Sequence, residues 1–145
     1  MKAEEKMEEE YRHIVNYYET DAMGMVHHSN YVRWMEEARS YMMDMFGYSY
    51  KKLESVGIGS PVLSYKCEIK HSTYYYDEIY IKARIIEYNG VRLTVEYEMK
   101  KDNKIVAIGE TKHCFLNKEG RPVRLNKECE ELDKIIKEQL NENIK

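Results

Sequence analysis

The chain has 145 residues, of which 43% are hydrophobic and 34% are charged, and its formal net charge is −3. This length is typical of one domain that buries its own core, and the composition excludes an intrinsically disordered protein. The chain has no overall basic charge that would attract nucleic acid. An acidic ligand would therefore need a local group of Lys or Arg side chains.

The cysteines and the N-terminus indicate the compartment. Cys67, Cys114 and Cys129 lie far apart and form no CxxC pair, so neither a zinc ribbon nor a redox motif is indicated. The charged N-terminus lacks the apolar segment of a signal peptide, and no apolar run reaches the roughly 18 residues that span a membrane. We therefore expect reduced thiols, a cytoplasmic protein and residues 1–9 as a solvated charged tail.

The N-terminal third predicts a strand, a loop and a helix. Alternating side chains from Tyr11 to Tyr17 predict the strand, and the loop over residues 20–28 has Gly24 as its flexible point. Five apolar side chains then recur at helical spacing: Tyr31, Met35, Ala38, Met42 and Met45. This stripe predicts a long, deeply packed helix.

The ends of that helix are marked by the residues that commonly cap helices. Ser29 or Asn30 is expected to accept a hydrogen bond from the free N–H groups of the first turn. Gly47 is expected to end the helix, because glycine readily adopts the left-handed conformation found there.

The rest of the chain alternates with a period of two and ends in a second helix. Four further strands are predicted, over residues 62–73, 79–85, 91–99 and 105–116. Asn89-Gly90 is the strongest hairpin signal, and Asn126 is expected to cap a terminal helix over residues 126–143. Strands joined by short turns require antiparallel pairing. The simplest architecture is an α+β domain in which a five-stranded antiparallel sheet wraps around the long helix.

Asp21 is the first candidate for chemistry, since it lies between the first predicted strand and the helix start. A loop carboxylate often only completes an Asx turn with its own backbone, and that structural role stays open here. The start of a helix, however, presents unpaired N–H groups that can stabilise an oxyanion. A carboxylate facing such groups can serve as a nucleophile or as a general base.

Two adjacent histidines, His27 and His28, precede the helix. Neighbouring side chains point in different directions, so this pair is a poor metal clamp, and we predict neither a metal nor another cofactor. His28 can hydrogen-bond a substrate carbonyl or Asp21, or it can be purely structural. The chain has no G-x-S-x-G, Walker or dinucleotide-binding motif.

The segment YYETDAMGMVHHSNYVRWMEEAR, Tyr17–Arg39, resembles the signature of hotdog-fold acyl-CoA thioesterases of the 4-hydroxybenzoyl-CoA thioesterase-like type. Those proteins share a strand ending in Tyr-x-x-x-Asp, a G-x-V/M-x-H-x-x-Y loop and a long helix wrapped by an antiparallel sheet. The resemblance extends through YYYDEI and NGVRLTVEYEM to about Arg124. It implies a single hotdog domain over residues 1–145, with the terminal helix as an addition. It also implies a homodimer or homotetramer with sites at the dimer interface.

The resemblance also implies roles for individual residues. Asp21 matches the catalytic carboxylate, Tyr17 the active-site tyrosine, and His28 the residue whose backbone N–H polarises the thioester carbonyl. Gly24, in the same loop, is expected to contact the substrate. The expected reaction is hydrolysis of an acyl-CoA to a carboxylic acid and CoA. A non-catalytic acyl-CoA-binding or regulatory protein and an acyl-thioester dehydratase are the alternatives.

CoA carries several phosphate charges, so a net acidic protein must hold it with a few local cations. Arg92 follows the Asn89-Gly90 turn, and Arg84 and Lys82 lie on the polar side of the preceding strand. We therefore predict that Arg84 and Arg92 bind the substrate. The alternative is that they are ordinary solvated strand residues.

Overall fold

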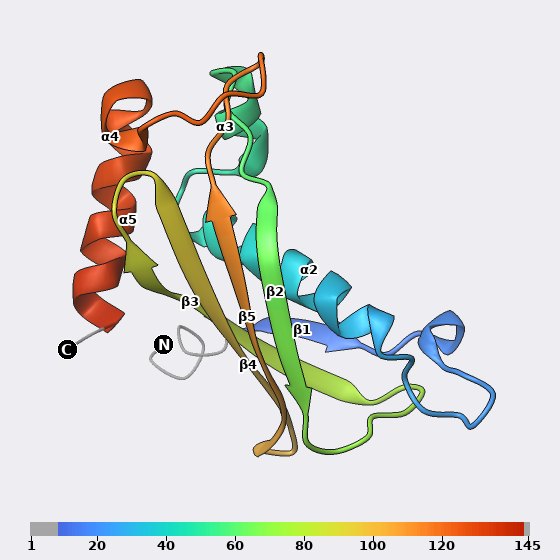
Figure 1. Cartoon of the computed structure of the whole chain (residues 1–145). Helices are drawn as coiled ribbons and strands as arrows, with labels where there is room; N and C mark the ends of the chain where they lie inside the picture. Colours follow the sequence, from blue (N-terminus) through green and yellow to red (C-terminus); the bar gives the residue numbers. More distant parts are fainter. Residues whose placement is uncertain (1–8, 144–145) are drawn as a thin grey trace. The chain divides into compact units, whose positions relative to one another are not determined.

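The structure, a computed structural model, describes residues 9–143 and belongs to the α+β class (Figure 1). The elements in chain order are β1 (Tyr11–Ile14), η1 (Tyr17–Glu19), α2 (Ser29–Met45), α3 (Tyr50–Ser55), β2 (Val62–Ile69), β3 (Glu78–Tyr88), β4 (Arg92–Lys101), β5 (Lys104–Cys114), α4 (Leu125–Glu128) and α5 (Glu130–Asn143). The strands form a five-stranded sheet in the order β1-β3-β4-β5-β2, in which β1 pairs antiparallel with β3. Short connections between consecutive strands require antiparallel pairing, so the predicted class and sheet are confirmed.

The chain divides into two compact units. Of the described residues, unit 1 comprises 9–42, Lys66–Ala83 and Tyr97–Gly109, and unit 2 comprises Met43–Tyr65, Arg84–Glu96 and 110–143. Strands β2, β3, β4 and β5 each contribute residues to both units. That the chain forms a single domain stays a prediction, and its expected N-terminal tail lies almost entirely outside the described residues.

Within unit 1, α2 packs closely against the strands. Trp34 and Met35 are fully buried, and a Cβ atom on Gly109 of β5 would collide with the sulfur of Met35. Arg39 is also buried, and its Nη1 donates to the hydroxyl of Tyr97 on β4 at 3.0 Å. The absence of a side chain at Gly109 therefore lets the helix approach the sheet closely.

The start of the chain differs from the prediction in two places. Strand β1 ends at Ile14 rather than at Tyr17, because Asn16 begins a 3-10 turn whose third residue, Glu19, bonds back to it. Helix α2 begins where expected, but Asn30 does not cap it by accepting a hydrogen bond. Its side-chain nitrogen instead donates to the carbonyls of Glu19 and His27.

The end of α2 is close to the prediction. The helix ends at Met45, and Gly47 follows with a positive φ of 78°, as expected for a helix-terminating glycine. Met45 itself is 48% exposed, so the buried stripe of the helix stops before it.

The hairpin signal is confirmed in unit 2, and the terminal helix is corrected. Gly90 has a φ of 90°, and the side chain of Asn89 accepts from the backbone of Arg92 at 2.7 Å. The predicted helix over residues 126–143 is two helices, interrupted at Cys129, whose sulfur lies 2.9 Å from the hydroxyl of Tyr48. Asn126 lies inside α4 rather than at its cap.

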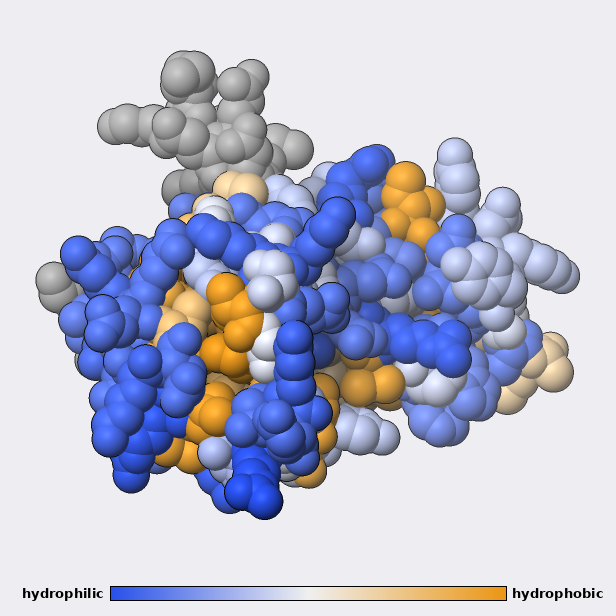
Figure 2. Space-filling model, turned by 90° about the horizontal axis from the view of Figure 1, so that it is seen from above, coloured by the Kyte–Doolittle hydropathy of each residue, from blue (hydrophilic) through white to orange (hydrophobic). Residues whose placement is uncertain are grey.

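Strand β2 ends at Ile69, short of the predicted Thr73, and it forms one edge of the sheet. Four of its apolar side chains are exposed: Val62, Leu63, Tyr65 and Ile69. The face shown in Figure 2 is mainly hydrophilic, with hydrophobic side chains exposed among the polar ones. No helix in the described part of the chain is long and apolar enough to cross a membrane.

Candidate active site

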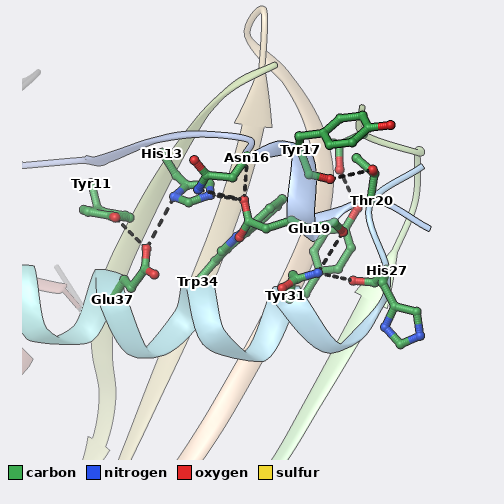
Figure 3. Close-up of polar contacts among 12 residues, drawn as sticks. Tyr11, His13, Asn16, Tyr17, Glu19, Thr20, His27, Tyr31, Trp34 and Glu37 are labelled. Atoms are coloured by element: carbon green, nitrogen blue, oxygen red, sulfur yellow. Dashed lines mark hydrogen bonds and ion pairs between the residues drawn. The ribbon is translucent and has the colours of Figure 1, made fainter. Parts of the chain in front are cut away.

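A buried carboxylate, Glu19, lies at the centre of a polar cluster in unit 1 (Figure 3). Its Oε1 accepts the backbone N–H of Asn16 at 2.8 Å and lies 2.8 Å from Nε2 of His13. Its Oε2 accepts the indole N–H of Trp34 at 2.7 Å. Burial raises the pKa of Glu19, but the hydrogen bonds from Asn16, Trp34 and His13 outweigh it and hold this pKa below its ordinary value. Glu19 is therefore ionised at neutral pH.

The backbone of Glu19 joins the two ends of the loop over residues 20–28. Its carbonyl accepts the N–H of His27 at 2.9 Å and the side-chain nitrogen of Asn30 at 2.8 Å. The same Asn30 nitrogen donates to the carbonyl of His27 at 3.2 Å. The residue before the loop thus holds both the end of the loop and the first turn of α2.

His13 makes further contacts with Glu37 and with the ring of Trp34. Its Nδ1 lies 3.4 Å from Oε2 of Glu37, which accepts the hydroxyl of Tyr11 at 2.5 Å. Burial and the hydrogen bond to Glu37 raise the pKa of Tyr11. The His13 ring packs on Trp34, with ring centroids 4.8 Å apart. The imidazole therefore lies between two carboxylates, Glu19 and Glu37.

Asp21 completes an Asx turn and keeps one oxygen unengaged. Its Oδ1 accepts the N–H groups of Met23 at 2.8 Å and Met25 at 3.2 Å, which is the structural role left open above. Its own N–H donates to the carbonyl of Met25 at 2.7 Å, and Gly24 takes a φ of 80° in the turn. No group in the described part of the chain donates to Oδ2. The carboxylate is thus held by one oxygen and presents the other.

The two histidines at the start of α2 behave differently. Nδ1 of His27 lies 2.8 Å from the hydroxyl of Ser29 and accepts the N–H of Ser29 at 3.2 Å. The exposed ring of His28 stacks on that of His27, with centroids 4.2 Å apart. Among the described residues, the N–H of His28 has no hydrogen-bond acceptor. It remains available as a donor at the helix start.

Tyr17 is 76% exposed, and its ring meets that of Tyr75 edge-on, with centroids 5.6 Å apart. Its carbonyl accepts the hydroxyl of Thr20 at 2.7 Å, which fixes the turn. In the described part of the chain, no hydrogen bond, ion pair or ring contact joins Tyr17, Asp21 and His28 to one another. They share one short segment without contacting each other.

The two predicted phosphate-binding arginines lie in unit 2 and have different surroundings. Arg84 pairs with Glu96, with Nη2 2.8 Å from Oε1. Arg92 has no ionic partner among the described residues and lines a cavity of about 510 Å³. The other lining residues are Glu87, Tyr88, Asn89, Leu93, Thr94, Lys112 and Leu140. Arg92 therefore remains available for an anion, whereas Arg84 is already neutralised.

The sequence interpretation missed Glu19, although a signal for it exists. Asn16 and Glu19 have the N-x-x-E spacing of a capping box: the carboxylate of Glu19 accepts the N–H of Asn16 at 2.8 Å, and the N–H of Glu19 donates to the backbone carbonyl of Asn16 at 3.0 Å. The described residues contain no group of three or more His, Cys, Asp or Glu side chains that could hold a metal ion.

Comparison with known sequences finds relatives over most of the chain. A model of the thioesterase-like superfamily matches residues 15–140. The chain is 38% identical over 122 residues to a protein of Aquifex aeolicus (strain VF5) described as an esterase, covering 84% of this chain and 94% of that protein. It is 31% identical over 115 residues to a protein of Bacillus subtilis (strain 168) described as the acyl-CoA thioesterase YneP, covering 78% of this chain and 83% of that protein.

Solved structures with a similar fold include a thioesterase. The structure of DHNA-CoA thioesterase from Staphylococcus aureus has a TM-score of 0.89 and 27% identity, covering 94% of each chain. A hypothetical protein from Aquifex aeolicus has a TM-score of 0.82 and 34% identity, covering 88% of this chain and 98% of that one. The expected hotdog fold is therefore confirmed.

Proposed function

The chain is a thioester hydrolase and belongs to the thioesterase-like superfamily, and we propose that its substrates are acyl-CoA thioesters. The name of the Bacillus subtilis relative and that of the Staphylococcus aureus structure both support a CoA thioester as substrate. The proposal rests on two groups that lie in one short segment. Asp21 has a carboxylate oxygen that accepts no hydrogen bond from the described residues, and His28, at the start of α2, has an unpaired N–H.

In one route Asp21 acts as a general base. Oδ2 takes a proton from water, and the water oxygen bonds to the thioester carbonyl carbon. The carbonyl oxygen becomes an oxyanion that accepts the N–H of His28, where the positive end of the helix dipole also favours negative charge. The carbon–sulfur bond then breaks, and the CoA thiolate leaves and takes up the proton that Asp21 held, which restores the carboxylate.

In the other route Asp21 is the nucleophile. Oδ2 bonds to the carbonyl carbon, the CoA thiolate leaves, and a mixed anhydride remains on Asp21. Water then attacks that anhydride and releases the carboxylic acid, which restores the carboxylate. Both routes use the same oxygen of Asp21 and the same N–H of His28. Both routes therefore require that the loop hold Asp21 and the His28 N–H in place.

We assign Tyr17 and Gly24 to the substrate side of this segment. The exposed ring of Tyr17 presents a hydroxyl close in sequence to Asp21. Gly24 lies at a positive φ, and a Cβ atom there would meet nothing within 4 Å, so a substrate can approach the backbone on that side.

We assign the CoA phosphates to the cavity in unit 2. Arg92 and Lys112 both line it, and the hydroxyl of Thr94 adds a neutral hydrogen-bonding group. Arg84 contributes less, because Glu96 already neutralises its charge. Because the overall charge of the chain is negative, the phosphates must be held by local cations such as these.

We also propose that the protein is a homo-oligomer. The edge strand β2 leaves backbone groups unpaired on its outer side, and its exposed apolar side chains would be covered by a second copy. Light scattering should give at least the mass of a dimer. The mass of a single chain at micromolar concentration would contradict this proposal.

A panel of acyl-CoA substrates with short, long, branched and aromatic acyl groups tests the function, with thiol release as the readout. Turnover of at least one substrate is the expected result. Saturable binding without thiol release would instead identify a non-catalytic acyl-CoA-binding protein. Loss of water from a hydroxyacyl substrate would identify a dehydratase.

A further inference from the structure

We propose that Glu19 is a positioning residue, whose buried carboxylate sets the place of the loop over residues 20–28. The loop carries Asp21 and ends at the His28 N–H that precedes α2. Only the naming of these two groups as reactive rests on the proposed thioesterase function. The anchoring itself rests on the contacts of Glu19.

Glu19 makes contact with the elements that precede and follow the loop in the chain. Its side chain reaches His13 on β1, Asn16 before η1 and Trp34 on α2 (Figure 3). Its carbonyl holds the loop end through His27 and the first turn of α2 through Asn30. Asp21 follows Glu19 by two residues, so little chain separates the anchor from the candidate catalytic carboxylate.

The donors around Glu19 require a carboxylate rather than any other side chain of the same shape. The indole N–H of Trp34 on Oε2 and the backbone N–H of Asn16 on Oε1 can only donate. A carboxylate accepts at both oxygens, whereas an amide accepts at one and donates at the other. Glu19→Gln would therefore place two donors face to face at one of these positions. A buried donor without an acceptor is unfavourable, so the cluster would rearrange.

The rest of the loop has contacts of its own. Asp21 bonds the backbone of Met23 and Met25, which keeps the internal shape of the loop. The N–H of Val26 donates to the carbonyl of Thr73 at 2.8 Å, and Met25 forms an isolated bridge with Tyr74. These contacts do not attach the loop to β1 or α2. Releasing Glu19 should therefore shift the loop relative to α2, while its internal turn and its contact with Thr73 remain. A displacement of about 1 Å at a reacting group can lower the rate by about 10²-fold.

The experiment compares Glu19→Gln with a matched substitution of the other strongly buried acid, Asp133→Asn. Asp133 is 7% exposed, accepts the hydroxyl of Tyr88 at 2.5 Å, pairs with Lys137 and does not line the unit 2 cavity. We expect Glu19→Gln to lower kcat by about 10- to 100-fold, with KM within about threefold of the wild-type value. Asp133→Asn should keep the wild-type kcat, even if both variants lose thermal stability equally.

Amide hydrogen exchange supplies a readout that needs no substrate. In Glu19→Gln the N–H of His27, which donates to the carbonyl of Glu19, should exchange faster, while the N–H groups of Met23 and Met25, which Asp21 holds within the loop, should exchange as in the wild type. In Asp133→Asn all three should exchange as in the wild type. If no acyl-CoA is turned over, the proposed function fails but this exchange result still tests the anchoring. Unchanged exchange in Glu19→Gln overturns the positioning role, and so does a loss of kcat that simply follows thermal stability in both variants.

Trp34→Phe provides a second variant if Glu19→Gln does not fold. It keeps an aromatic ring in the core and removes the single donor to Oε2. We expect faster exchange of the His27 N–H and a loss of kcat of about three- to tenfold, smaller than in Glu19→Gln, because the contacts from Asn16 and His13 remain. Wild-type exchange and wild-type kcat in this variant would overturn the proposal.

Discussion

The loop that carries Asp21 in unit 1 and the hairpin that carries Arg92 in unit 2 hold their charged groups in opposite ways. Around the loop, a buried carboxylate on Glu19 accepts hydrogen bonds from fixed side-chain and backbone donors. Around the hairpin, Arg92 is exposed, has no ionic partner among the described residues and borders a cavity. One region holds its charged group through several neighbours, whereas the other leaves its charge exposed.

This difference fits the role proposed for each region. A group that reacts with a carbonyl carbon must be held to within a fraction of an ångström, and about 0.5 Å is a typical tolerance. A cation that attracts a phosphate works over several ångströms and tolerates movement. Substitutions in the loop should therefore act on kcat, and substitutions at the hairpin should act on KM.

The sharpest test of this division is Asp21→Asn. Asparagine keeps the oxygen that accepts from Met23 and Met25, so the loop retains its shape while the charge is lost. We expect kcat to fall by about 10²- to 10⁴-fold, with folding and acyl-CoA binding nearly unchanged. Steady-state kinetics and thermal unfolding measure both. Asp102→Asn, at an exposed turn with a φ of 51°, is the control and should keep the wild-type kcat. Near-wild-type turnover in Asp21→Asn would remove Asp21 from the chemistry.

Acid unfolding provides a second, smaller test of the anchored region. The pKa of Glu19 is lowered in the folded protein, so its contribution to stability is present above about 4.5 and is lost as pH falls through the folded-state pKa. The groups that face it are His13, Asn16 and Trp34, with Glu37 beyond His13. The free energy of unfolding of the wild type should therefore fall more steeply below pH 4.5 than that of Glu19→Gln. Parallel curves for the two proteins would show that Glu19 does not contribute as a charged group.

Local signals in the sequence predicted much of this architecture, and distant contacts explain what they missed. Asn89-Gly90 located a hairpin and the stripe from Tyr31 to Met42 located α2, because both depend on neighbours along the chain. Cys129, where the predicted terminal helix is interrupted, contacts Tyr48, which lies 81 residues away, and no local pattern reports such a contact. In the same way, the N-x-x-E spacing of Asn16 and Glu19 is visible in the sequence. The burial of Glu19 is not, because it involves Trp34, 15 residues further on.

The residues of the candidate site show the same difference between local signals and distant contacts. Asp21, Tyr17 and His28 were found through one contiguous motif, and their roles stay predictions. The pairing of Arg84 with Glu96 links adjacent strands, so the motif could not show that Arg84 is neutralised while Arg92 is not. Sequence patterns therefore locate reactive groups better than they locate the groups that hold or neutralise them.

The smallest expected effect belongs to the hairpin. Arg92→Ala should raise KM for acyl-CoA by about two- to fivefold and leave kcat unchanged, because an exposed ionic contact is worth only about 0.5–1 kcal/mol and is the same in the ground and transition states. The effect should shrink as salt rises, since exposed charges are screened beyond about 8 Å at physiological ionic strength. It should disappear for an acyl-pantetheine substrate that lacks the nucleotide phosphates.

Two further arginines of unit 2 show whether the effect is specific to Arg92. Arg84→Ala should change KM less, because its charge is already paired at 2.8 Å with Glu96. Arg121→Ala removes an exposed arginine that does not line the cavity and should change neither constant. An equal rise in KM for all three would indicate a diffuse charge effect rather than a phosphate site. If Arg92→Ala lowered kcat equally on acyl-CoA and on acyl-pantetheine, the hairpin would support the reacting centre, and the contrast between an anchored loop and an adaptable cavity would fail.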